Sequence, residues 1–146
     1  MVESLGSSFI IRNAVIPDDY LDIIDLWETA GSGIQLSSSD SIEEITKKQL
    51  RDPELFLVAE ENKRITAAVL GGFDGRRGIV YHLAVREEYR DQGLGEGLMI
   101  ELEKRWKKLG CIRSYLLITP GNLKARQFYE NRNWEIEDLL IMAKDL

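Results

Sequence analysis

The chain has 146 residues, a formal net charge of −6 at pH 7 and a single cysteine, Cys111. This length suits one domain with its own hydrophobic core, and we expect a flexible N-terminus over residues 1–8 and a single domain over residues 9–146. The acidic charge argues against nucleic-acid binding, which needs a basic surface. One cysteine excludes an internal disulfide. With neither an apolar membrane span nor a basic leader in the sequence, we expect a cytoplasmic protein with no membrane partner.

The N-terminal half predicts strands and helices in alternation. Short β-branched and apolar runs indicate strands, and apolar residues every three or four positions indicate helices. Ser41 is a predicted helix cap, because Glu44 three residues later completes a capping box. The expected elements are a strand over residues 9–14, a helix over 17–27, a polar loop over 31–41, a helix after Ser41, and a hairpin of strands 55–59 and 64–71.

The most informative segment, residues 90–97, lies between a predicted strand over 78–85 and a predicted helix. Its Gly93 and Gly95 let the backbone turn sharply and approach a ligand closely. The helix that begins here leaves unpaired N–H groups at its first turn, and these suit a phosphate. The dinucleotide motif would need a third glycine and the Walker loop a Gly-Lys-Ser/Thr, so the pyrophosphate of coenzyme A is the remaining common ligand. The apolar stripe of the helix is Leu94, Leu98, Leu102, Trp106 and Leu109.

The C-terminal part predicts a further strand, a helix and two closing strands. Residues 115–119 are strand-like, and Asn122 is a suitable N-cap for the helix that follows. Residues 134–137 and 140–144 are expected to form the last strands of the sheet.

Two motifs in this order resemble those of the GNAT N-acetyltransferase superfamily. Its members carry Arg/Gln-x-x-Gly-x-Gly/Ala after the fourth strand and Asn-x-x-Ala-x-x-Phe-Tyr-x-x-x-Gly-Phe/Tyr further on. Asn133 and Trp134 replace the final Gly-Phe/Tyr, and asparagine also tolerates a left-handed backbone. The resemblance extends from Ile11 to Leu146 and looks closest to the small YpeA-like acetyltransferases. The matching residues are Arg90, Gly93, Gly95, Asn122, Ala125, Phe128 and Tyr129.

The resemblance implies an α/β fold, the acyl-CoA N-acyltransferase fold, with a mixed, mostly antiparallel sheet and helices on both faces. It implies an enzyme that moves the acetyl group of acetyl-CoA directly to a primary amine of a small molecule or peptide, without a metal. Segment 31–41 is then either a solvated connector or an acceptor-binding loop. Whether the chain forms a homodimer is left open. The residues implied to bind the cofactor are Leu83, Ala84, Val85, Arg90, Asp91, Gln92, Gly93, Leu94, Gly95, Glu96, Asn122 and Tyr129.

The resemblance also implies catalytic roles. Tyr129 matches the tyrosine that protonates the departing thiolate, and the backbone N–H of Val85 would polarise the thioester carbonyl. The base is left open, because Leu117 stands where acetyltransferases of ribosomal-protein N-termini carry a glutamate. His82 and Tyr81 on the predicted central strand are substitutes for this glutamate, and Glu60 at the end of another strand or a water held by the backbone are further alternatives. His82 is the catalytic candidate, since an imidazole changes charge near neutral pH, and strand alternation predicts that Tyr81 and His82 face opposite sides. A lone histidine on a strand is more often a packing residue, so we expect His82→Gln to cost less than about tenfold in rate.

Two alternatives remain at this point. A chain that lacks the glutamate could hold acyl-CoA as a sensor or scaffold without turnover. An enzyme could also use a longer acyl-CoA, since no residue in the sequence excludes one.

Overall fold

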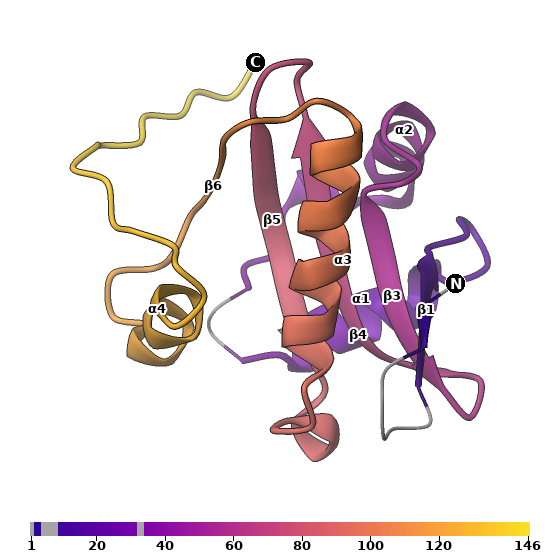
Figure 1. The fold of residues 1–146 in the computed structure, drawn as a ribbon. Coiled ribbons are helices and arrows are strands. Elements are labelled where there is room, and N and C mark those ends of the chain that lie inside the picture. The colour runs from indigo at the N-terminus through magenta and orange to yellow at the C-terminus, as the bar shows by residue number, and fades with distance from the viewer. Residues whose placement is uncertain (1, 4–8, 32–33) are drawn as a thin grey trace.

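The computed structural model describes residues 2–3, 9–31 and 34–146. Its core is a six-stranded sheet in the order β1 to β6, antiparallel throughout except for the parallel pair of β5 and β6 (Figure 1). The strands are β1 (Val2–Glu3), β2 (Ile10–Asn13), β3 (Phe56–Glu61), β4 (Arg64–Phe73), β5 (Gly78–Val85) and β6 (Ser114–Leu116). The helices are α1 (Tyr20–Thr29), α2 (Ile42–Arg51), α3 (Leu94–Lys108) and α4 (Leu123–Glu130), with short 3₁₀ turns η1 (Ser38–Asp40) and η2 (Glu87–Tyr89).

Helices cover both faces of the sheet, as the sequence predicts. In Figure 1, α3 lies in front of the central strands and α1 behind them. The α3 face buries Leu94, Leu98, Leu102 and Trp106, whereas Leu109, which follows the helix, is half exposed. Burial of such side chains stabilises the fold by about 1.5–3 kcal/mol each. The mixed sheet between two helical layers is therefore confirmed.

The predicted ends of the domain differ from the structure. Val2 and Glu3 form β1 against β2, while the rest of the expected flexible segment, residues 1 and 4–8, lies outside the described residues. The predicted strands over 134–137 and 140–144 are wrong, because residues 134–146 contain no strand. A strand-like composition forms a strand only where the backbone also pairs with a neighbouring strand, and these residues do not pair. Trp134 packs against the ring of Tyr129 instead, and the chain then runs away from the sheet (Figure 1).

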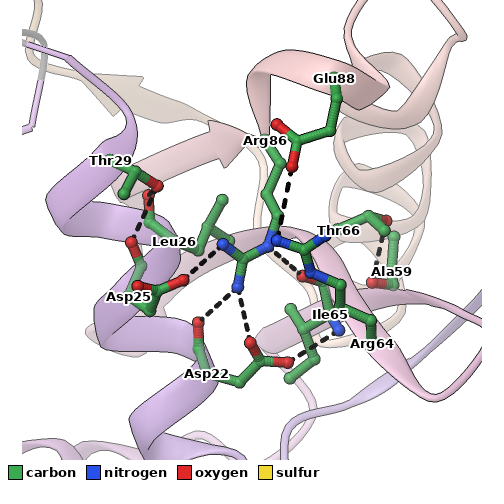
Figure 2. Close-up of polar contacts among 10 residues, drawn as sticks. All are labelled: Asp22, Asp25, Leu26, Thr29, Ala59, Arg64, Ile65, Thr66, Arg86 and Glu88. Carbon is green, nitrogen blue, oxygen red and sulfur yellow. Dashed lines mark hydrogen bonds and ion pairs between the residues drawn. The ribbon is translucent and has the colours of Figure 1, made fainter.

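A buried arginine holds α1 against the end of β5 (Figure 2). The Arg86 guanidinium lies 2.6 Å from carboxylate oxygens of both Asp22 and Asp25, and it donates to the carbonyl of Ile65 at 2.8 Å. The backbone N–H of Arg86 donates to the Thr66 carbonyl at 2.8 Å. These bonds fix α1 relative to β4 and β5, and β5 lines the candidate site described below.

Arg86→Met should lower the free energy of unfolding by about 1–3 kcal/mol. The substitution removes several charge-assisted bonds, but Asp22 and Asp25 are partly exposed and regain water, which limits the loss. Arg64→Met is the matched control: Arg64 pairs with Glu88 at the surface, where an ion pair contributes about 1 kcal/mol or less. Urea unfolding of both variants measures the difference, and equal losses would contradict the structural role of Arg86.

Candidate active site

A cleft opens where β6 separates from β5. The two strands pair only from Gly78 and Ser114 to Val80 and Leu116. Beyond that point residues 81–85 of β5 form one wall, and residues 117–119 after β6 form the opposite wall. The cleft has a volume of about 650 Å³. Leu83, Ala84 and Val85, which the resemblance implies as cofactor-binding residues, line this cleft, and their contact with a cofactor stays a prediction.

A β-bulge changes the side-chain pattern on β5. Leu70 pairs with His82 and the next residue, Gly71, pairs with Val80, so Tyr81 is the extra residue. Tyr81 lies over Gly72 near the Lys48 side chain of α2, and His82 contacts Trp27 of α1. Both side chains thus lie on the face that α1 and α2 cover. The prediction that they face opposite sides is wrong, because strand alternation is interrupted at the bulge.

The loop before α3 forms one end of the cleft. Gly93 is the N-cap of α3 and has a left-handed backbone with φ of 82°. A Cβ at Gly93 would meet no protein atom within 4 Å, so the space beside it is open. The first N–H groups of α3 have no intrahelical acceptor. The loop residues that line the cleft are Arg90, Asp91, Gly93, Leu94, Gly95 and Glu96, whereas Gln92 is not among the lining residues.

Basic side chains surround this loop in spite of the acidic chain. Arg90 and Lys124 line the cleft, and Arg126 lies outside its lining in an ion pair with Glu130 at 3.1 Å. Arg132 also lines the cleft, with its guanidinium 3.8 Å above the centre of the Phe128 ring and 3.4 Å from the carboxylate of Glu96. Basic side chains thus line the cleft beside the acidic Asp91 and Glu96, at the α3 N-terminus, whose helix dipole favours an anion.

Tyr129 lines the cleft from α4. Its ring is nearly buried, edge-on to Phe128 and Trp134 at centroid distances of 5.1 and 5.8 Å. Burial raises the pKa of the Tyr129 phenol, and nearby Arg132 lowers it to a smaller extent. The hydroxyl therefore stays protonated through neutral pH and is available as a hydrogen-bond donor.

Asn122 caps α4 as predicted. Its Oδ1 accepts a hydrogen bond from the Ala125 N–H at 3.1 Å. Because Oδ1 is used for the cap, the side-chain amide keeps its N–H donors for a ligand, and Asn122 lines the cleft.

The candidate bases have different surroundings. His82 lines the cleft, and its Nε2 lies 3.0 Å from the Asp40 carboxylate. Burial raises the pKa of Tyr81, which keeps that phenol protonated and makes it a poor base at neutral pH. Glu60 is held in an ion pair with Arg12 at 2.7 Å. Leu117 lines the cleft at the position where a glutamate base would stand.

Cys111 lies away from this chemistry. It is buried, its thiol contacts the Arg113 carbonyl at 3.2 Å, and it does not line the cleft. Within the described ranges no group of three or more His, Cys, Asp or Glu side chains could hold a metal ion. In the same part of the chain no helix is long and apolar enough to cross a membrane.

Sequence reasoning missed Asp40 and Ile34, which the 31–41 loop brings to this region. Ile34 lines the cleft and Asp40 contacts His82. The pattern Ser37-x-x-Asp40 is a capping-box signal that the sequence does contain, and the structure shows this box around η1. No local sequence pattern predicts the contact between Asp40 and His82.

A family model described as the acetyltransferase (GNAT) family matches residues 20–134. The chain belongs to this family. An acetyltransferase from Yersinia pestis is 36% identical over 129 residues, which span 88% of this chain and 90% of that protein. A similar match, at 35% identity over 129 residues with the same coverage, is an acetyltransferase from Pectobacterium atrosepticum.

Solved structures share the fold. An N-acetyltransferase from Thermoplasma acidophilum, crystallised in complex with coenzyme A, gives a TM-score of 0.77 at 21% identity, with 91% of this chain and 93% of that chain covered. At this identity the likeness shows the fold alone. It confirms the GNAT fold that the sequence motifs imply.

Proposed function

We propose that this GNAT acyltransferase moves the acetyl group of acetyl-CoA directly to a primary amine. The observation that carries the proposal is the cleft between the separated strands β5 and β6, with the open Gly93 turn at one end and His82 and Tyr129 along its lining. The family membership and a fold shared with a structure that contains coenzyme A support the donor. In this proposal the enzyme is cytoplasmic and its acceptor is a small molecule or peptide.

The coenzyme fits the charges and the backbone of the cleft. Its pyrophosphate would meet the free N–H groups at the start of α3, where the helix dipole favours an anion. Arg90 and Lys124 would contact the outer phosphate, and the amide of Asn122 would donate to the pantetheine arm. This arm would then run along residues 83–85 toward the acceptor end of the cleft.

The reaction needs a free amine, a polarised carbonyl and a proton for the thiolate. A lysine-like amine has a pKa of about 10.4, so deprotonation at pH 7 costs about 4.6 kcal/mol. The amine nitrogen attacks the thioester carbon, the C–N bond forms and the C–S bond breaks. His82 takes the proton from the nitrogen, the N–H of Val85 polarises the carbonyl, and Tyr129 donates to the departing thiolate.

Release of free coenzyme A thiol from acetyl-CoA, measured with a panel of polyamines, amino acids, aminoglycosides and peptides, tests this proposal. We expect at least one amine to accelerate thiol release well above the rate without amine. Tight acetyl-CoA binding with no acceleration by any amine would favour a sensor or scaffold module. Faster thiol release from a longer acyl-CoA would show that the longer acyl-CoA, and not acetyl-CoA, is the donor.

Gly93→Val should weaken coenzyme A binding at least tenfold, which is about 1.4 kcal/mol. The valine side chain would enter the open space beside the turn and strain a left-handed backbone. Gly75→Val is the matched control, because Gly75 has φ of 99°, equally open surroundings and no place in the cleft lining. Calorimetry of both variants separates ligand contact from strain. Equal affinities in two folded variants would contradict the assignment of this loop.

A further inference from the structure

His82 has a carboxylate partner that lies far away in the sequence. The Asp40 Oδ1 is 3.0 Å from His82 Nε2, across a sequence separation of 42 residues. Both side chains are largely buried, at 8% exposure for Asp40 and 16% for His82. The imidazole packs against Trp27 in a T-shaped arrangement, with ring centroids 4.7 Å apart and ring planes at 64°. The imidazole is thus held between an anion and an aromatic ring.

Asp40 is itself fixed from two directions. Its Oδ2 accepts the backbone N–H of Ser37 at 3.0 Å. Its backbone carbonyl accepts the Tyr20 hydroxyl at 2.8 Å. The carboxylate therefore cannot turn away from His82 without losing the Ser37 bond.

This geometry selects one tautomer of the imidazole. An ionised carboxylate only accepts hydrogen bonds, so Nε2 of His82 must carry the proton and donate it to Asp40. The other ring nitrogen, Nδ1, is then unprotonated in the neutral ring. Nδ1 has no hydrogen-bond partner among the described residues. It is also absent from the set of polar side-chain atoms in these residues that are both buried and without a partner, so it is not buried. Nδ1 is therefore accessible and able to accept a proton.

We propose that Asp40 is the positioning residue of an Asp40–His82 pair that deprotonates the acceptor amine. The role of the pair in deprotonating an amine rests on the proposed function, whereas the preferred tautomer of His82 does not. The amine proton passes to Nδ1 as the C–N bond forms, and the Asp40 carboxylate stabilises the imidazolium that results. Loop 31–41 thus contributes to the site through Asp40, whose side chain sets the ring orientation.

The state of the ring can be measured directly, because His82 is the only histidine of the chain. In ¹⁵N-labelled protein at a pH where the ring is neutral, ¹H–¹⁵N correlation spectra should show the Nε2–H tautomer as the dominant form. Asp40→Asn should remove this dominance. Asparagine offers one acceptor oxygen, and if that oxygen keeps the Ser37 N–H bond, the amide N–H₂ faces Nε2 and favours the Nδ1–H tautomer.

Ser37→Ala is the matched control. It removes the Ser37 hydroxyl that accepts from the Ser39 N–H and leaves the Asp40 carboxylate and its contact with His82 in place. We expect the Nε2–H tautomer in this variant. A dominant Nδ1–H tautomer in the wild-type chain, or an unchanged tautomer in folded Asp40→Asn, would overturn the proposal.

Kinetics with an active acceptor complete the test. Asp40→Asn should lower kcat by about tenfold or more, with the KM for acetyl-CoA unchanged, and the double variant Asp40→Asn/His82→Gln should be no slower than His82→Gln alone. If the kcat losses of the two single variants instead multiply in the double variant, the two residues act independently and the proposed pair is overturned. The Nε2–H tautomer together with no transfer to any amine would instead refute the proposed function and leave the positioning of His82 by Asp40 standing.

Discussion

Tyr129→Phe should lower kcat for acetyl transfer by about 10²- to 10⁴-fold while the affinity for coenzyme A changes little. The phenylalanine keeps the ring contacts with Phe128 and Trp134 and removes only the hydroxyl. Because burial raises the pKa of Tyr129, the hydroxyl can donate to the thiolate over the whole neutral range. The same shift makes complete proton transfer less favourable, so a hydrogen bond that strengthens in the transition state is the expected contribution.

Tyr115→Phe is the control for this experiment. Tyr115 lies on β6 outside the cleft lining, and the same chemical change there should leave kcat within about twofold. Single-turnover rates and calorimetry separate chemistry from binding. A Tyr129→Phe enzyme that turns over at the wild-type rate would make Tyr129 a packing residue.

His82→Gln is the second substitution with a large expected effect, a loss of about 10²- to 10⁴-fold in kcat. The sequence alone favours a loss below tenfold, because a lone histidine on a strand is usually structural. The contact with Asp40 changes that expectation, since a histidine oriented by a carboxylate with an accessible second nitrogen has the arrangement of a general base.

Tyr81→Phe is the matched control for His82→Gln. Tyr81 lines the same cleft on the same face of β5, and its raised pKa keeps it protonated and unable to act as a base at neutral pH. We expect removal of the Tyr81 hydroxyl to change kcat by less than about threefold. If His82→Gln costs less than tenfold in a folded enzyme that binds coenzyme A normally, the base lies elsewhere, for example in a bound water.

Local patterns account for most of the fold. The apolar run over residues 78–85 is β5, the stripe that begins at Leu94 is α3, and Asn122 caps α4 as its side chain suggests. In each case the deciding interactions lie within a few residues, where spacing and capping preferences act.

The remaining features depend on contacts between distant segments. The bulge at Tyr81 arises from pairing with β4, and it places His82 beside Trp27. The Asp40–His82 contact joins two segments that share no local pattern. Residues 134–137 and 140–144 have strand-like composition but pair with no neighbouring strand. Contacts between distant segments, and not local secondary-structure propensity, therefore determine these features.

The most direct test of acetyl transfer follows both products in one reaction. The enzyme is supplied with acetyl-CoA carrying a ¹³C-labelled acetyl group and the best amine of the panel, and free thiol and labelled acetamide are measured together. Direct transfer predicts one labelled acetamide for each thiol released, with both rates lost in His82→Gln and Tyr129→Phe. Thiol release with labelled acetate and no acetamide would contradict the account, because water would then be the acceptor.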